Sequence, residues 1–108
     1  MSILVTGATG FAGSWLIEAL INQTDSVHGL SRRGTWPASC SHLATHAKLH
    51  VCDLSDNSSV LAILRETEPQ EIYHLAGYPY AGRSFKEPDE AWKGNLHASM
   101  SLCNAIVA

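Results

Sequence analysis

The sequence has few charges and lacks the features typical of nucleic-acid-binding and membrane proteins. Only 16% of its 108 residues are charged, the formal net charge is −3, and no block of basic residues occurs. This pattern argues against a nucleic-acid partner. No apolar run approaches the length of a membrane span, because Glu18 interrupts the longest candidate. The 45% content of hydrophobic residues is typical of a single soluble domain over residues 1–108.

Cysteine is also scarce. Cys40, Cys52 and Cys103 are odd in number and show no C-x-x-C spacing, which argues against a disulfide framework. No secretory signal precedes the apolar residues 3–5. We therefore expect a cytoplasmic protein with free thiols.

Glycine, in contrast, is concentrated near the start of the chain. Gly7, Gly10 and Gly13 lie within the segment VTGATGFAG, directly after a short apolar run. A strand that ends in a glycine turn and continues as a helix presents backbone N–H groups that bind phosphate. Glycine also lets the backbone approach a pyrophosphate and lets the helix pack closely on the strand. A plain structural turn is the alternative interpretation of these glycines taken alone.

Hydrophobic periodicity predicts alternating strands and helices along the whole chain. The expected strands span residues 2–6, 26–31, 48–52 and 71–76, and the expected helices span 11–22, 55 or 56 to 66, and the region after Pro88, with loops at 32–46 and 77–87. Helical spacing assigns Trp15 and Trp92 to the core. With right-handed crossovers, this order predicts a Rossmann-like α/β fold: an open parallel sheet of four strands, order 3-2-1-4, with flanking helices.

Four strand ends then meet at one edge of the predicted sheet, where ligands of such folds bind. The first strand ends in a turn containing Thr9, the second is followed by Arg32 and Arg33, and the third by Asp53. The fourth ends in small residues, HLAG, that leave room for a ligand. A pyrophosphate over the first strand places a ribose over the second and an adenine toward the third. This convergence predicts a dinucleotide site.

The end of the second strand bears on the choice of cofactor. A ribose 2′-hydroxyl calls for an acidic residue there, but no acid lies between Asp25 and Asp53. Arg32 and Arg33 instead offer guanidinium donors to a phosphate, which favours NADP, with NAD still possible. A solvated arginine pair is the alternative. Asp53 is expected to accept a hydrogen bond from the adenine amino group, or else to cap a helix.

The segments VTGATGFAG, CDLSD, EIYHLAG and NLHAS resemble the N-terminal part of extended short-chain dehydrogenases/reductases, the NAD-dependent epimerase/dehydratase family. VHGLSRR, LHVCDLSD, EPQEIYHLAG and GRSFKEP resemble, more narrowly, GDP-mannose 4,6-dehydratases and GDP-4-keto-6-deoxymannose reductases. The resemblance implies a full-length dehydratase (a lyase), epimerase or reductase (an oxidoreductase). Such an enzyme transfers a hydride at C4 of a nucleotide sugar and is a possible homo-oligomer.

The same resemblance assigns residues to the cofactor. They are Gly7, Thr9, Gly10, Phe11, Ala12 and Gly13 in the phosphate loop, Arg32 and Arg33 at the 2′-phosphate, Asp53 and Leu54 at the adenine, and Leu75 and Ala76 near the middle of the cofactor. Ser84 lies in a loop that would face the sugar.

One family feature is missing from these 108 residues. None of the three tyrosines has a lysine four residues later, so the family's catalytic Tyr-x-x-x-Lys is absent. The resemblance implies that this pair and the substrate domain lie beyond residue 108, so no residue of this chain is assigned as catalytic. We expect the N-terminal cofactor-binding portion of a larger enzyme, inactive alone. A non-catalytic dinucleotide-binding module or a truncated remnant without turnover is the alternative.

A group of potential zinc ligands falls in the middle of the chain. Cys40, His42, His46 and His50 lie within 11 positions, and the spacing of His42 and His46 would place them on one helical face. His50, however, falls on a predicted strand, and zinc needs well-placed ligands. A histidine-rich surface loop without a metal is the preferred interpretation.

Overall fold

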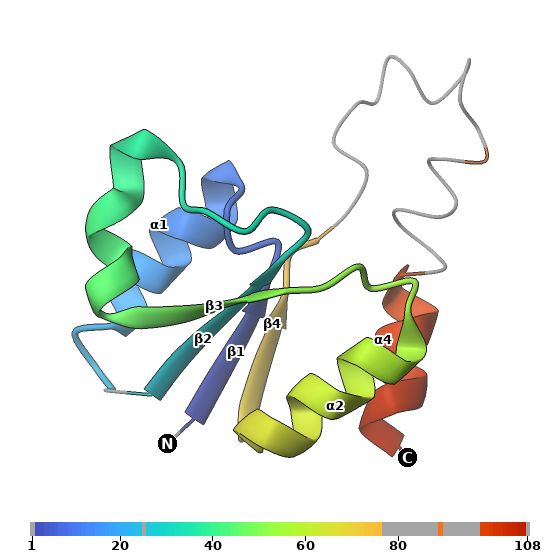
Figure 1. Cartoon of the computed structure of the whole chain (residues 1–108). Coiled ribbons are helices and arrows are strands. Elements are labelled where there is room, and N and C mark those ends of the chain that lie inside the picture. The colour runs from blue at the N-terminus through green and yellow to red at the C-terminus, as the bar shows by residue number, and fades with distance from the viewer. Residues whose placement is uncertain (1, 25, 77–88, 90–97, 108) are drawn as a thin grey trace.

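The computed structural model describes residues 2–24, 26–76, 89 and 98–107. One parallel sheet runs in the order β3-β2-β1-β4 (Figure 1). Its strands are β1 (Ser2–Thr6), β2 (Ser26–Ser31), β3 (Ala47–Val51) and β4 (Glu71–His74). The α/β class and the strand order predicted from the sequence are both confirmed.

Helices cover both faces of the sheet. They are α1 (Phe11–Leu20), the 3₁₀ helix η1 (Ala38–Thr45), α2 (Asn57–Thr67) and α4 (Ala98–Val107). α1 and η1 lie on one face, while α2 and α4 pack together on the other (Figure 1). The result is the three-layered arrangement of a doubly wound fold.

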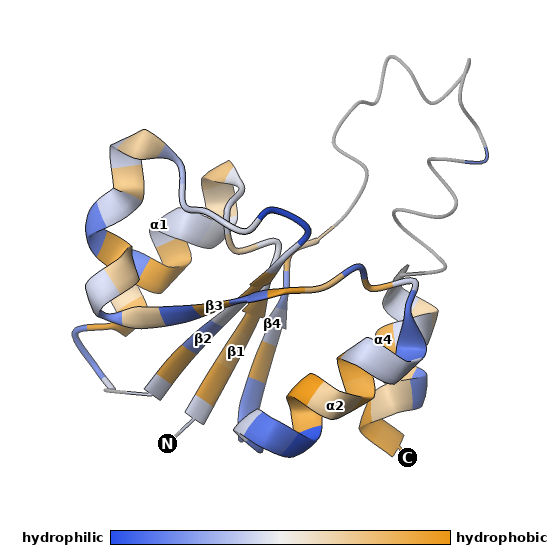
Figure 2. Cartoon of the chain, in the orientation of Figure 1, coloured by the Kyte–Doolittle hydropathy of each residue, from blue (hydrophilic) through white to orange (hydrophobic). Residues whose placement is uncertain are grey.

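β1 is the central strand of the core. Ile3 and Val5 are buried on the side of α1, and Leu4 is buried on the side of α2 and α4. Because both faces of the sheet are covered, β1 is hydrophobic along most of its length (Figure 2). This burial holds the turn that follows β1 at a defined place on the sheet edge.

Several predicted boundaries differ from the structure. The predicted loop 32–46 contains η1, because Cys40 and Leu43 lie three residues apart and are both buried against the sheet. β3 begins and ends one residue earlier than predicted, and β4 ends at His74 instead of residue 76. α1 is two residues shorter at its C-terminus. Of the two positions at which this helix was expected to begin, 55 and 56, the second is correct: Asp56 caps α2, and its side chain accepts a hydrogen bond from Ser59 N.

The prediction that Trp15 belongs to the core is wrong. Its side chain is 64% exposed, and Phe11 one turn earlier is 85% exposed. The buried side of α1 is formed by Gly13, Ile17 and Leu20. The first two turns of α1 therefore carry aromatic residues on the solvent side, with the two rings 6.4 Å apart. Trp92 lies outside the described residues.

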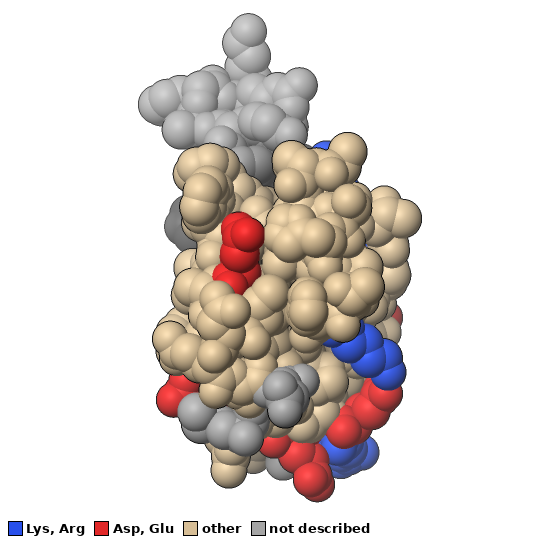
Figure 3. Space-filling view, turned by 90° about the vertical axis from the view of Figure 1, so that its left-hand side faces the viewer, with Lys and Arg blue, Asp and Glu red and all other residues tan. Residues whose placement is uncertain are grey.

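No helix in the described part of the chain is both long enough and apolar enough to cross a membrane. On the face of the molecule shown in Figure 3, acidic and basic side chains alternate along the lower edge, and much of the upper part is uncharged. That face carries no broad basic surface among the described residues.

Candidate functional site

The turn after β1 is packed so tightly that two of its glycines are required by the fold. Gly7 has a φ of 66°, and a Cβ atom on it would lie 2.8 Å from the Ala76 backbone nitrogen. A Cβ on Gly13 would overlap the carbonyl oxygen of Gly7. Gly10 N donates to that same oxygen at 3.1 Å. Gly7 and Gly13 thus let the loop, α1 and the end of β4 meet at backbone distance.

Gly10 differs from the other two glycines because it is exposed and its surroundings are less crowded. It is the N-cap of α1, with φ −76° and ψ 174°, and no side chain among the described residues caps this end. A Cβ on Gly10 would approach only the Gly7 oxygen, at 3.3 Å. Phe11 and Ala12 are exposed, and first-turn N–H groups have no acceptor within their own helix. The N-terminus of α1 is therefore suited to binding an anion such as phosphate.

Thr6 connects the ends of β1 and β4. Its buried Oγ1 accepts hydrogen bonds from Leu75 N at 3.0 Å and Ala76 N at 3.1 Å. It also lies 2.7 Å from Nδ1 of His74, whose Nε2 is 2.9 Å from Oγ of Ser99 on α4. Thr6 thereby holds the two residues that follow β4, beside the Gly7 turn.

This network defines the protonation of His74. Because two N–H groups occupy the acceptor positions of Thr6 Oγ1, the hydroxyl proton must point to His74 Nδ1. Nδ1 is therefore an acceptor, and the Nε2–H donates to Ser99. Burial lowers the pKa of His74 below its ordinary value of 6.5, so the neutral ring agrees with the hydrogen bonding.

Ser31 connects the turn after β1 with the arginine segment. Its Oγ lies 2.7 Å from Thr9 Oγ1 and accepts a hydrogen bond from Arg33 N at 3.1 Å. Ala8 N donates to Leu30 O at 3.3 Å. Arg32 and Arg33 have exposed side chains. The predicted ribose end of the site is therefore joined to the turn by the end of β2.

The end of β3 excludes one interpretation of Asp53. Asp53 Oδ1 accepts hydrogen bonds from Ser55 N at 2.9 Å and Ser55 Oγ at 2.8 Å, which closes a turn. Because Asp56 caps α2, the alternative that Asp53 is the helix cap is wrong. Leu54 is buried in the core beside α2.

The structure brings most of the predicted site residues to one edge of the sheet, because all four strands are parallel and end there. Leu75 is 44% exposed and Ala76 is partly buried. Ser84 lies outside the described residues. Sequence reasoning missed the supporting roles of Thr6, Ser31 and Ser99. A threonine at the end of an apolar strand was the available signal for Thr6, whereas nothing local indicates that Ser99 meets His74.

A family model described as the NAD dependent epimerase/dehydratase family matches residues 3–108. The chain belongs to this family. The resemblance to the NAD-dependent epimerase/dehydratase family is thereby confirmed.

Curated relatives from the epimerase/dehydratase family are similar over nearly the whole chain. GDP-mannose 4,6-dehydratase of Vibrio cholerae is 33% identical over 112 residues, covering 95% of this chain and 30% of that protein. GDP-mannose 4,6 dehydratase of Drosophila melanogaster is 35% identical over 113 residues, covering 95% of this chain and 29% of that protein. The chain thus spans less than a third of the length of these relatives.

Solved epimerase structures share the fold. UDP-glucose 4-epimerase of Thermotoga maritima, solved with UDP-glucose, has a TM-score of 0.86 and 27% identity, covering 97% of this chain and 33% of that one. UDP-glucose 4-epimerase of Thermus thermophilus, solved as a complex with NAD, has a TM-score of 0.86 and 28% identity, with the same coverage.

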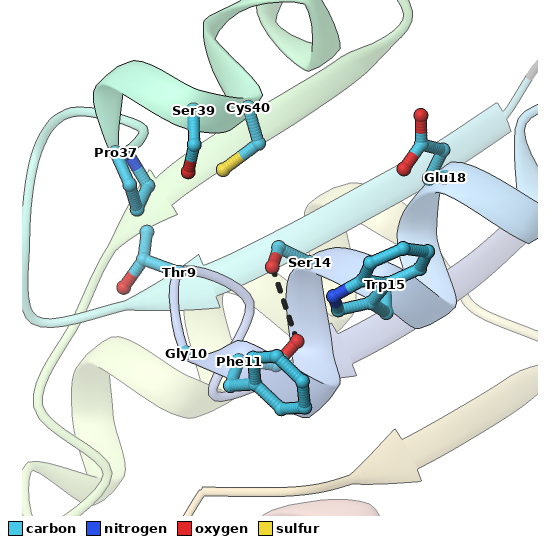
Figure 4. Close-up of a pocket in the computed structure, with 9 residues that line it drawn as sticks. All are labelled: Thr9, Gly10, Phe11, Ser14, Trp15, Glu18, Pro37, Ser39 and Cys40. Atoms are coloured by element: carbon cyan, nitrogen blue, oxygen red, sulfur yellow. Dashed lines mark hydrogen bonds between the residues drawn. The ribbon is translucent and has the colours of Figure 1, made fainter.

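A cavity of about 390 Å³ lies beside the glycine turn of this epimerase/dehydratase chain (Figure 4). It is lined by Thr9, Gly10, Phe11, Ser14, Trp15, Glu18, Pro37, Ser39 and Cys40. It shares three residues with the predicted phosphate loop but runs between α1 and η1. Arg32, Asp53 and Ala76 do not line it. The cavity therefore extends the site outward along α1 and does not lie over the end of β4.

The four potential zinc ligands weighed between residues 40 and 50 are not brought together. His42 Nε2 pairs with Glu18 Oε1 at 3.1 Å, and the His50 ring instead meets His28. His46 lies outside η1, as its C-cap residue with a φ of −118°, so the two histidines do not share a continuous helical face. Within the described ranges, no three His, Cys, Asp or Glu side chains gather as a metal cluster.

Proposed function

We propose that residues 1–108 form the NADP-binding N-terminal portion of a nucleotide-sugar dehydratase, epimerase or reductase similar to GDP-mannose 4,6-dehydratase. The observation that carries this proposal is the tight packing of the uncapped α1 terminus against the ends of β1 and β4, beside the ends of β2 and β3. The family membership and the NAD complex of the Thermus epimerase support it. A cytoplasmic homo-oligomer acting on a GDP-sugar completes the proposal.

Each strand end has a role in this proposal. The exposed N–H groups of Phe11 and Ala12 bind the pyrophosphate, which approaches over the exposed surface of Gly10. Arg32 and Arg33 bind the 2′-phosphate, and Asp53 lies at the adenine. When bound, the nicotinamide supplies hydride exchange with C4 of the sugar.

The remaining predicted residues complete the site. Leu54 packs beneath the adenine, and Leu75 and Ala76 border the middle of the cofactor. They are held there by Thr6. Ser84 is assigned to the sugar side from the resemblance alone.

A second candidate is a dinucleotide-binding module without turnover. The observation that favours it is the absence of Tyr-x-x-x-Lys from the 108 residues, because a tyrosine with a pKa near 10 needs a nearby cation to act as an acid or base. In both candidates the chain alone binds the dinucleotide and does not turn over a nucleotide sugar.

Cofactor choice tests the proposal directly. The chain should bind NADP more tightly than NAD, by roughly ten- to a hundredfold, since charged hydrogen bonds to a phosphate contribute about 1.5–3 kcal/mol. Replacing both Arg32 and Arg33 with serine should remove most of this preference and spare NAD affinity. Calorimetric dissociation constants for both dinucleotides, at low and moderate salt, provide the measurement.

The matched control is Arg65→Ser, which removes an exposed arginine from the last turn of α2. It should leave the preference unchanged. Added salt should narrow the preference of the unaltered chain, because exposed charges are screened. Equal affinity of that chain for NADP and NAD would overturn the arginine assignment, and no binding of either would overturn the proposed function.

The phosphate loop provides an independent prediction. Gly10→Val should weaken dinucleotide binding at least tenfold while the chain stays folded, because Gly10 is exposed and the added side chain stands where the pyrophosphate is expected. Calorimetry gives the affinity, and circular dichroism reports the fold. Ala62→Val, on the exposed side of α2, is the control. Unchanged affinity of Gly10→Val would show that the loop does not hold the cofactor.

A further inference from the structure

Ser31, the last residue of β2, joins the ends of three strands at the edge of the site. Its Oγ lies 2.7 Å from Oγ1 of Thr9 in the turn after β1. The same Oγ accepts a hydrogen bond from Arg33 N at 3.1 Å. The Ser31 carbonyl oxygen accepts another from Cys52 N, directly after β3, at 2.8 Å. Ser31 therefore fixes the glycine turn, the backbone of the two arginines and the end of β3 relative to one another.

The contact between the two hydroxyl groups does not depend on which of them donates. The Arg33 N–H uses one lone pair of Ser31 Oγ, which leaves the hydroxyl proton and a second lone pair for Thr9. Ser31 is only 8% exposed, so little water can take the place of either partner. The hydrogen bonds that join Thr9, Ser31 and Arg33 are called the hydroxyl bridge below.

The hydroxyl bridge holds the backbone from which two exposed arginines extend. The side chains of Arg32 and Arg33 are both exposed, and ordering them on a phosphate group costs conformational entropy. A backbone that is already fixed reduces the part of this cost that falls on binding. The benefit applies to a ligand with a 2′-phosphate for the arginines to contact. It does not apply to a dinucleotide that lacks this group.

We propose that the hydroxyl bridge positions the two arginines and thereby sets the preference for NADP over NAD. The inference rests on the proposed function, which assigns Arg32 and Arg33 to the 2′-phosphate. Ser31 is a positioning residue in it, because its buried hydroxyl acts through the backbone of Arg33. Thr9 reaches the bridge from the predicted phosphate loop. The pyrophosphate end and the 2′-phosphate end of the site are thus held in one geometry before the ligand arrives.

The test measures calorimetric dissociation constants of the 108-residue chain and its variants for NADP and for NAD. Ser31→Ala removes the acceptor of Arg33 N and keeps a small side chain on β2. It should weaken NADP binding about three- to tenfold, the value of one hydrogen bond, and change NAD binding less than about twofold. Ser31→Thr retains the hydroxyl and should keep the preference. Ser26→Ala removes a hydroxyl from the opposite end of β2 and should leave both constants unchanged.

Combined variants show whether the effect passes through the bridge. In a chain with both Arg32→Ser and Arg33→Ser, adding Ser31→Ala should not change the ratio of the two constants, because the side chains that it positions are gone. Thr9→Val alone should lower the preference for NADP, and adding it to Ser31→Ala should lower the preference no further. Thr45→Val removes an exposed hydroxyl of η1 and should leave the ratio unchanged.

Circular dichroism reports whether each variant keeps the fold, and if Ser31→Ala does not fold, the ratio measured on Thr9→Val decides the question. An equal loss of NADP and NAD affinity in Ser31→Ala would reduce Ser31 to a structural role and overturn the inference, as would additive effects in the combined variants. A preference for NADP that survives Ser31→Ala overturns the inference alone. Binding of neither dinucleotide by the unaltered chain overturns the proposed function together with it.

Discussion

Gly13→Ala should remove much of the chain's stability, lowering the free energy of unfolding by about 3 kcal/mol. The added Cβ overlaps the Gly7 carbonyl oxygen and also lies 3.0 Å from the Ala8 Cα. All of these atoms belong to the backbone of a turn that is held by β1 on one side and α1 on the other. No side-chain rotation can relieve the overlap. Urea-induced unfolding followed by circular dichroism measures the loss.

Gly34→Ala is the matched control for Gly13→Ala. A Cβ on Gly34 would lie 3.5 Å from Val51 Cγ2, an ordinary contact, and its backbone does not need positive φ. Its free energy of unfolding should change by less than about 1 kcal/mol. If both variants are equally stable, α1 does not approach the turn as closely as described.

Thr6→Val should cost about 2–4 kcal/mol of stability, although the two side chains are nearly the same size. The valine leaves the N–H groups of Leu75 and Ala76 and the Nδ1 of His74 without their hydroxyl partner. Each buried polar group left unsatisfied costs about 1–3 kcal/mol. Urea unfolding gives the difference. The same variant should bind dinucleotide more weakly, because residues 75 and 76 are released.

Thr67→Val is the control for Thr6→Val. Thr67 is also buried, but among the described residues its hydroxyl bonds only to the carbonyl of Ile63 within α2, at 2.8 Å. Its loss should cost about 1 kcal/mol or less. Equal costs for the two valine variants would show that Thr6 does not hold the end of β4.

The pH dependence of the free energy of unfolding gives a second test of the contact between Thr6 and His74. The pKa of His74 is lowered in the folded chain, so the unfolded chain binds more protons as the pH falls through 6.5. The contribution of neutral His74 to the free energy of unfolding is therefore fully present above pH 6.5 and decreases below it. In Thr6→Val, the Nδ1 of His74 no longer receives a proton from the hydroxyl, and its protonation opposes folding less. The stability gap between the two proteins should narrow from about pH 7.5 to about pH 5.5.

The sequence predicts the fold well where local patterns are strong. The apolar run before Gly7 and the spacing of the three glycines identify β1, the turn and the start of α1. The exposure of Trp15 could not be predicted from spacing, because α1 has more apolar positions than its buried side accommodates. The helix η1 was missed because the prediction assigned its small polar residues to a loop. The burial of its residues Cys40 and Leu43 depends on the neighbouring β3, which the local sequence does not reveal.

The candidate site could also be predicted only in part. Residues that follow strands could be assigned to the site edge, because parallel strands end together. The hydrogen bonds of Thr6, Ser31 and His74 depend on three-dimensional neighbours that local sequence does not specify. The meeting of His28 with His50 depends on the register of β2 and β3.

The Thr6 contacts also have a consequence for folding. Thr6 bonds to residues 68 to 70 positions later in the chain, and closing so long a loop carries an entropic cost before any contact compensates for it. Contacts of such sequence separation slow folding. A nascent chain released before β4 is synthesised therefore contains the whole glycine turn but not the group that closes it. The site becomes competent only when one of the latest segments of the sheet has docked against one of the earliest.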